Sequence, residues 1–251
     1  WGSAQPHERL IERIDQADYS IDACLYSLSL QSVATALIDA HDRGVEVRFI
    51  YDDDHNQDQV SQIAAAGITV IDDSYGQNDG NGLQHNKFLI FDARDASSAS
   101  DDWVWTGSLN LISAGGMGIN AMQNSIEIQD QSLALAYTLE FNEMWGSNTV
   151  TPDPNYSLFG DNKTDNTPHH FVIGDYPAEA YFSPSDQVTT HLIDLVGTSE
   201  YSSYFCMFSF TRDDINDAFH DQFTDVPGYQ VRGVFDSGYD QYSEYEPMVA
   251  W

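Results

Sequence analysis

Basic residues are scarce in this chain of 251 residues. It has 9 lysines and arginines against 40 aspartates and glutamates, so its formal net charge is −31 at pH 7. Only two of the basic residues are lysines, Lys87 and Lys163. A surface this acidic repels phosphate polymers and anionic lipid at low salt. Since the Debye length falls to about 3 Å at 1 M salt, we interpret the aspartate-rich, lysine-poor composition as adaptation to a high-salt environment.

Cysteine and long apolar runs are also rare. Cys24 and Cys206 lie in apolar segments, which predicts two small buried residues rather than a disulfide framework. No stretch approaches the roughly 20 apolar residues that a membrane-spanning helix needs, so no transmembrane segment is predicted. With 41% hydrophobic residues, the chain is too apolar to be disordered.

The sequence contains an internal repeat. Residues 24–29 (CLYSLS) recur as 206–211 (CMFSFT), and residues 47–52 (VRFIYD) recur as 231–236 (VRGVFD). The offset is 182 for the first pair and 184 for the second, which indicates two copies of one unit. We expect a first domain over 1–148, a connection over 149–178, and the N-terminal part of a second domain over 179–251. Both copies are expected to be cut relative to a longer parent.

Helical and strand patterns alternate along the first copy. Helices are predicted at 6–17, 33–41, 60–66 and 132–145, and strands at 21–28, 45–51, 68–71, 88–93, 104–106 and 125–128. In the last helix, Leu135, Leu139 and Met144 are expected to face inward. The alternation predicts an α/β layered fold with a mixed, largely parallel sheet.

Residues 85–92 (HNKFLIFD) carry the most specific chemical signal. They fit the pattern H-x-K-x-x-x-x-D, and strand alternation places His85 and Lys87 on one face at the start of a strand. A neutral imidazole beside an ammonium suits nucleophilic attack on a phosphodiester whose oxygens the lysine holds. Asp92, near the far end of the strand, is expected to act as an orienting partner rather than as a base. The alternative is a capped strand with a surface histidine and lysine.

Further polar residues follow the next strand. Ser108 and Asn110 are expected to donate hydrogen bonds to phosphate oxygens from the turn that ends this strand, and Asn124 is expected to bind the phosphate with them and Lys87.

These motifs resemble those of the phospholipase D superfamily, which is named for the H-x-K-x4-D signature. More narrowly, the chain resembles bacterial tandem-domain members described as HKD-family nucleases. The resemblance extends over nearly the whole chain and is carried by residues 83–88, 105–111, 136–137, 140–141, 159–160, Lys163, 166–169, 181–184 and 231–236.

The resemblance implies a two-step reaction without a metal or another cofactor. One motif histidine attacks phosphorus to form a phosphohistidine, and the other protonates the leaving group and later activates water or an alcohol. His85 is then one of this pair, Lys87 holds the phosphate, and Ser108 and Asn110 support it. Which histidine is the nucleophile stays open.

Two departures from the family pattern stand out. Asn124 lies where single-motif relatives often place a glutamate that contacts the histidine; an amide can orient an imidazole but cannot stabilise imidazolium by charge. The second motif is absent, since the offset places its histidine near position 269. We expect it to come from a missing part or from a second chain, and we expect this chain alone to fold but to be weakly active or inactive.

Three functions follow from these observations. The first is a metal-independent nuclease, although a −31 surface opposes a polyanion. The second is a phospholipase D or phosphatidyltransferase that acts on phospholipids, although no basic amphipathic helix is visible. The third is an inactive phosphate-binding module. The family and the absent N-terminal methionine also suggest a secreted or periplasmic location.

Two weaker signals concern metals. Residues 52–55 (DDDH) suit Ca²⁺ or Mg²⁺, but an acidic strand end is the preferred interpretation. His169 and His170 could form a metal pair, although a structural role is preferred. No metal site is therefore predicted.

Overall fold

The computed structural model describes residues 5–55, 57–78, 83–113, 123–238 and 243–250. It divides into two compact units, unit 1 over Trp1–Ser185 and unit 2 over Asp186–Trp251. The segment expected to connect two domains, 149–178, thus belongs to unit 1. It packs there because the backbone N–H of Leu158 donates to Glu143 O at 3.0 Å and Lys163 forms a buried ion pair with Glu140.

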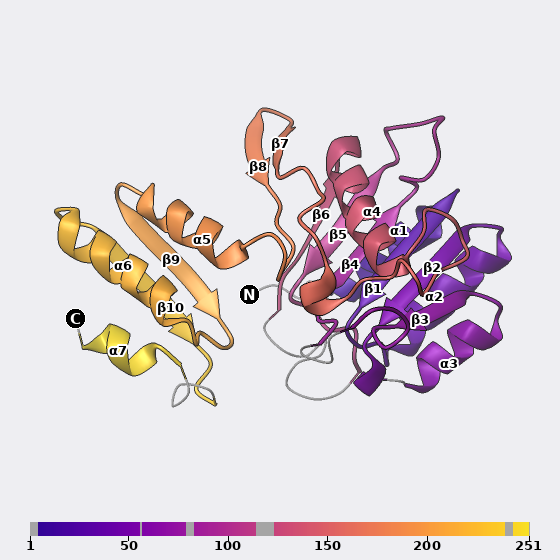
Figure 1. Cartoon of the computed structure of the whole chain (residues 1–251), viewed down its shortest axis with the longest axis horizontal. Helices are drawn as coiled ribbons and strands as arrows, with labels where there is room; N and C mark the ends of the chain where they lie inside the picture. Colours follow the sequence, from indigo (N-terminus) through magenta and orange to yellow (C-terminus); the bar gives the residue numbers. More distant parts are fainter. Residues whose placement is uncertain (1–4, 56, 79–82, 114–122, 239–242, 251) are drawn as a thin grey trace. The chain divides into compact units, whose positions relative to one another are not determined.

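A six-stranded mixed sheet organises unit 1 (Figure 1). Its order is β3-β2-β1-β4-β5-β6, from strands β1 (Ser20–Leu25), β2 (Glu46–Tyr51), β3 (Thr69–Asp72), β4 (Lys87–Phe91), β5 (Trp103–Gly107) and β6 (Ser125–Gln129). The α/β layered fold with a mixed sheet is confirmed. Parallel pairing is confined to β1, β2 and β3, and the other neighbours pair antiparallel.

Helices cover both faces of this sheet. One face packs against helices α1 (Pro6–Gln16), α2 (Gln31–Asp42) and α3 (Asp58–Ala65), and the other against α4 (Gln131–Trp145). Each central strand is therefore buried on both sides, and every residue of β1 and β4 is buried. None of the helices in the described part of the chain is both long and apolar enough to cross a membrane.

The orientation of α4 differs from the prediction. Met144 is buried as expected, but Leu135 and Leu139 are each 46% exposed. The buried face instead includes Leu133 and Phe141. Apolar residues occur on more than one side of this helix, so periodicity alone did not identify the face that meets the sheet.

A buried ion pair lies between α4 and the sheet. Arg48 donates from Nε and Nη2 to the two carboxylate oxygens of Asp22, at 2.7 Å each, and both side chains are almost completely buried. The guanidinium carbon lies 4.6 Å from the centre of the Phe141 ring, and Nη1 donates to Thr149 O. The pair is thus satisfied by hydrogen bonds and covered by an aromatic ring.

The connecting segment contains structure that the sequence did not predict. It holds the short 3-10 helix η2 (Gly160–Asn162) and most of a hairpin formed by strands β7 (His170–Ile173) and β8 (Tyr176–Glu179). A second 3-10 helix, η1 (Asp53–His55), follows β2.

Unit 2 contains a smaller version of the same strand pair. Strands β9 (Ser202–Met207) and β10 (Gln230–Phe235) pair in parallel, with helices α5 (Val188–Gly197), α6 (Asp213–Asp225) and α7 (Tyr245–Val249). Ser202 lies opposite Gln230 in this pair, as Ser20 lies opposite Glu46 in unit 1. The repeat offset of 182 relates Ser20 to Ser202, and the offset of 184 relates Glu46 to Gln230, so both copies pair their strands in the same register.

The prediction for the cysteines holds only in part. Cys24 is buried, but Cys206 is exposed, and both are free thiols. Cys24 lies on the face of the sheet that α4 covers, whereas the face of β9 that carries Cys206 has no such cover among the described residues.

Candidate active site

His85 and Lys87 lie where the chain enters the centre of the sheet. Lys87 is the first residue of β4, which pairs with β1 on one side and β5 on the other. The backbone N–H of Tyr26 donates to Asn86 O at 2.8 Å, which continues the β1–β4 pairing by one step. His85 is exposed at this edge, whereas Lys87 is 8% exposed.

Burial sets the charges of these two side chains. Lys87 Nζ donates to the backbone O of His85 at 2.7 Å and lies 4.8 Å from the centre of the Tyr26 ring. Burial lowers the pKa of Lys87 to about 8. Partial burial, followed by the charge of Lys87, lowers the pKa of His85 below its usual 6.5. At neutral pH the site therefore presents a neutral imidazole beside an ammonium, which is the protonation state a nucleophilic histidine requires.

Asp52 connects β2 to the segment before His85 through hydrogen bonds. It follows β2, is 0% exposed, and accepts a hydrogen bond from the backbone N–H of Gln84 at 3.0 Å. Its other oxygen lies 3.1 Å from Nδ1 of His55. Its negative charge opposes the lowering of the pKa of both His85 and Lys87. The sequence marked Asp52 as part of an acidic cluster and, through its recurrence as Asp236, as a site-facing strand end; the structure adds its hydrogen bond to the residue before His85.

Tyr26 contacts two imidazole rings at this edge. Its ring centre lies 4.4 Å from that of His85 and 4.2 Å from that of His55. Tyr26 directly follows β1, so the contact arises because parallel β1 and β2 end at the same edge of the sheet. Sequence reasoning missed Tyr26, and the position of an aromatic residue after a buried strand was the one available signal.

Ser108 and Asn124 lie together at the end of β5. The Ser108 N–H donates to Asn124 O, and the Asn124 N–H donates to Ser108 Oγ, both at 3.1 Å. Gly107 permits this approach, because a Cβ atom there would lie 2.3 Å from Asn124 O. Asn110 is 6% exposed, and its Oδ1 has no hydrogen-bond partner among the described residues. Among the described residues, Ser108, Asn110 and Asn124 make no hydrogen bond to His85, whereas Lys87 donates to its backbone O.

The structure does not bring Asp92 to His85. Asp92 follows β4 at the end opposite Lys87, is 3% exposed and has a φ of 58°. Its carboxylate accepts hydrogen bonds from the backbone N–H groups of Asp18, Tyr19 and Ser20 at 2.7–3.2 Å. Asp92 thus joins the end of β4 to the segment that leads from α1 into β1.

The second lysine has a different role from the first. Lys163 and Glu140 form an ion pair in which both side chains are almost fully buried. Both lysines of the chain are therefore buried, one at the candidate site and one in the packing of α4 against the connecting segment.

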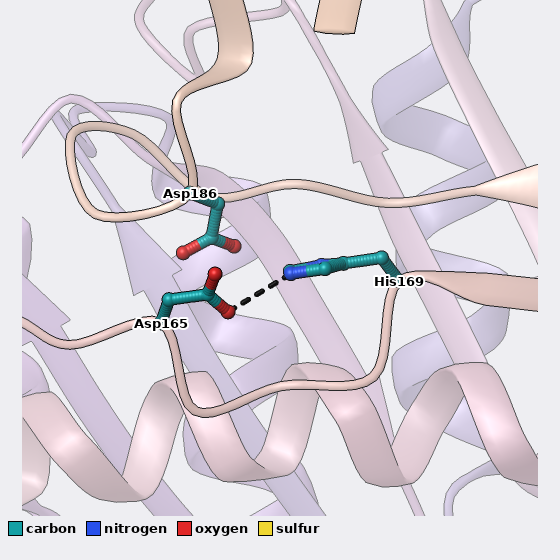
Figure 2. Close-up of side chains that lie close together, drawn as sticks. All are labelled: Asp165, His169 and Asp186. Carbon is teal, nitrogen blue, oxygen red and sulfur yellow. Dashed lines mark hydrogen bonds and ion pairs between the residues drawn. The ribbon is translucent and has the colours of Figure 1, made fainter.

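His169 takes part in local packing. Its Nε2 lies 2.9 Å from Asp165 Oδ1, the contact drawn in Figure 2, and its Nδ1 lies 3.0 Å from Ala180 O. Its ring stacks on Tyr181 with the ring centres 4.6 Å apart. These contacts fit the structural role preferred from the sequence. The carboxylates of Asp52, Asp53 and Asp54 do lie within 4.8 Å of one another, but Asp52 already bonds Gln84 and His55.

Comparisons with known proteins cover mainly unit 1. The family described as cardiolipin synthase, PLD-like domain, matches residues 10–145. Mitochondrial cardiolipin hydrolase of Xenopus tropicalis is 30% identical over 144 residues, which are 55% of this chain and 60% of that protein. Phospholipase D of Rickettsia typhi is 31% identical over 141 residues, which are 56% and 63% of the two chains. This chain thus matches about three fifths of the length of these curated relatives.

A solved structure resembles both units. Phosphatidylserine synthase of Haemophilus influenzae matches 93% of this chain and 60% of its own, with a TM-score of 0.57 and 14% sequence identity, which shows a shared fold. The family match includes β1 to β6 and thus the segment from His85 to Asp92. The chain belongs to the phospholipase D superfamily, through a PLD-like domain of the cardiolipin synthase type.

Proposed function

We propose that this protein hydrolyses phospholipid phosphodiesters through a phosphohistidine formed on His85. The observation that carries the proposal is the pairing of an exposed imidazole of lowered pKa with the buried ammonium of Lys87 at the edge of the sheet. A neutral imidazole nitrogen attacks phosphorus, and the ammonium stabilises the charge that develops on the phosphoryl oxygens.

The reaction then has two steps. In the first, a bond forms between an imidazole nitrogen of His85 and phosphorus while the bond from phosphorus to the leaving oxygen breaks, and that oxygen takes a proton from a general acid. In the second, water attacks phosphorus, the nitrogen–phosphorus bond breaks, and the proton of water returns to the acid. Ser108 and Asn110, at the end of β5, are proposed to contact the phosphoryl oxygens.

A phospholipid substrate is better supported than the nucleic acid first expected from the sequence. The relatives are named cardiolipin hydrolase and phospholipase D. A nucleic acid would need free cations along its path, but Arg13, Arg48 and Lys163 are already paired inside unit 1. Leu83, two residues before His85, is 55% exposed and offers an apolar contact for an acyl chain.

Substrate assays with a trapping step test this proposal. The chain is incubated with phosphatidylcholine micelles, cardiolipin micelles and single-stranded DNA in about 1 M KCl, where surface charge is screened. EDTA is present throughout. We expect slow phospholipid cleavage, because the second motif histidine is expected to come from outside this chain, and mass spectrometry after a neutral quench should find the phosphoryl adduct on His85.

Replacement of the nucleophile supplies the control. His85→Ala should lower turnover by at least about 10⁴-fold and abolish the adduct, with an unchanged unfolding midpoint. His41→Ala, in α2, is the matched histidine control and should change neither. Turnover that survives in His85→Ala would contradict the proposal, and so would faster cleavage of DNA than of either lipid. Loss of activity in EDTA would contradict a mechanism that needs no metal.

A further inference from the structure

A cluster of three carboxylates lies in the loop between β4 and β5, at the end of these strands opposite the candidate active site. Asp95, Asp101 and Asp102 each place one carboxylate oxygen within 4.8 Å of the other two. β4 and β5 pair antiparallel with Phe91 opposite Trp103, so the loop leaves and re-enters the sheet at neighbouring positions. The strand pairing thus brings the two ends of the loop together and creates a cluster that the sequence alone did not predict.

Asp102 carries a buried charge that lacks a partner. Its side chain belongs to a residue that is 1% exposed, and its Oδ1 has no hydrogen-bond partner among the described residues. Burial raises the pKa of Asp102 to about 6, against a hydrogen bond from the Gln131 side chain at the start of α4. The negative charges of Asp101 and Asp95 raise this pKa further. At pH 7 the carboxylate is still mainly ionised, and buried ionised carboxylates in proteins are paired with a cation or bind a metal.

The protein supplies no cation for this cluster within the part of the chain that the structure describes. Arg94 is the basic residue of the loop, and it pairs with Asp22 and Glu46 instead. Asp101 resembles Asp102, because its Oδ1 is also buried and has no hydrogen-bond partner among the described residues. Two neighbouring carboxylates therefore each hold an oxygen that neither water nor a protein donor satisfies.

The rest of the loop is held in place by hydrogen bonds. Ser97 Oγ donates to Asp95 Oδ2 at 2.6 Å, and the backbone N–H of Ser98 donates to Asp95 Oδ1 at 3.3 Å. Gln129 Nε2, at the end of β6, donates to Ala99 O at 2.8 Å. The Asp95 carboxylate is thus oriented by the loop, and the loop is attached to the edge of the sheet.

We propose that Asp95, Asp101 and Asp102 bind one Ca²⁺ that stabilises the β4–β5 loop. Ca²⁺ takes oxygen ligands at about 2.3–2.6 Å, so two ligands of one ion are at most about 5 Å apart, which fits oxygens within 4.8 Å of one another. Water completes its coordination from the exposed side of the loop. Mg²⁺ suits a loop site less well, because it demands near-octahedral geometry at about 2.0–2.1 Å. The ion lies at the end of β4 opposite Lys87, so its role is structural and independent of the proposed function.

Thermal unfolding of the whole chain tests the site. The unfolding midpoint is measured by circular dichroism in about 1 M KCl, where general screening of the acidic surface is already present. The additions compared are EDTA, CaCl₂ and MgCl₂, the two salts at about 5 mM. A ion that binds only the folded state stabilises it, so CaCl₂ should raise the midpoint by at least about 4 °C relative to EDTA. MgCl₂ should raise it by less than about 1 °C.

Matched variants assign the response to this loop. Asp102→Asn keeps an oxygen that accepts from Gln131 but removes the unpaired charge, so it should abolish the response to CaCl₂. In EDTA it should unfold at the same temperature as the wild type or higher, because the buried charge is gone. Asp101→Asn should weaken Ca²⁺ binding, measured by titration calorimetry, by at least about tenfold. Asp53→Asn, in the acidic cluster after β2, is the control and should leave the response unchanged.

The outcomes that would overturn the inference are distinct. The wild type would show no rise in CaCl₂, or an equal rise in CaCl₂ and MgCl₂. An equal response to CaCl₂ in Asp102→Asn and the wild type would place the ion elsewhere, and so would loss of the response in Asp53→Asn. A midpoint of Asp102→Asn that falls equally in EDTA and in CaCl₂ would show that the carboxylate serves packing rather than ion binding.

Discussion

Units 1 and 2 contain the same parallel strand pair in the same register but in different surroundings. In unit 1, all of β1 is buried, and Asp52 at the end of β2 is fully buried and bonds two partners. In unit 2, β9 has no fully buried residue and includes exposed ones, and Asp236, which the repeat relates to Asp52, is exposed. The strand pair alone therefore does not create the chemistry.

The difference lies in what covers the second face of the sheet. In unit 1, α4 covers the face that carries Asp22, Arg48 and Cys24. In unit 2, the corresponding positions hold Tyr204, Arg232 and Cys206, and all three are exposed. A site that depends on buried charge needs both layers, because burial is what shifts the pKa of a group such as Lys87.

The largest effect is expected where this buried face carries charge. Arg48→Met removes the hydrogen-bonded partner of Asp22 and leaves a buried carboxylate, with only Arg94 nearby, so the free energy of unfolding should fall by about 3 kcal/mol. Arg232→Met at the related exposed position should change it by less than about 0.5 kcal/mol. Urea titrations followed by circular dichroism measure both, and equal losses would contradict the comparison.

The pH dependence of turnover gives the next effect. Neutral His85 is the active form, so activity should rise with pH through its lowered pKa, below 6.5. Charged Lys87 is required, so activity should fall as pH rises through about 8. Lys87→Arg keeps its charge and should move this alkaline limb to higher pH. A profile of kcat/KM against pH with the same alkaline limb in the variant would assign that limb to another group.

The smallest effect concerns thiol reactivity. Burial raises the pKa of the Cys24 thiol well above its usual value, so it should stay unmodified in the folded protein. Cys206 is exposed and should react with iodoacetamide under the same conditions. Peptide mass spectrometry reads both sites. Labelling of Cys24 at the same rate as Cys206 would show that α4 does not protect its face of the sheet.

Most helices and strands of unit 1 were predicted from the sequence because their apolar residues follow a clear spacing. The buried strands read as continuous apolar runs, and the helices carry apolar residues at helical spacing. The β7–β8 hairpin was missed because each strand has only four residues, Pro177 lies within β8, and Gly174 lies in the turn between them. The side of α4 that contains Leu135 and Leu139 was misassigned because which face meets the sheet depends on tertiary packing.

The site shows a similar division between local and long-range information. His85 and Lys87 lie two residues apart, so a local pattern predicts them. Tyr26, Asp52 and His55 reach the same edge from the ends of two other strands. The pairing of the strands brings them near His85, and this pairing could not be predicted from a single sequence.

The burial of both lysines also determines how the protein meets amine reagents. Lys163 lies in a buried ion pair with Glu140, so a reagent has little access to its amine. Lys87, with its pKa near 8, is partly uncharged in mildly alkaline solution and lies at the edge of the site. Of the two lysine side chains, Lys87 is therefore the one expected to be acylated in mildly alkaline solution, and peptide mapping of that lysine would report on the state of the site.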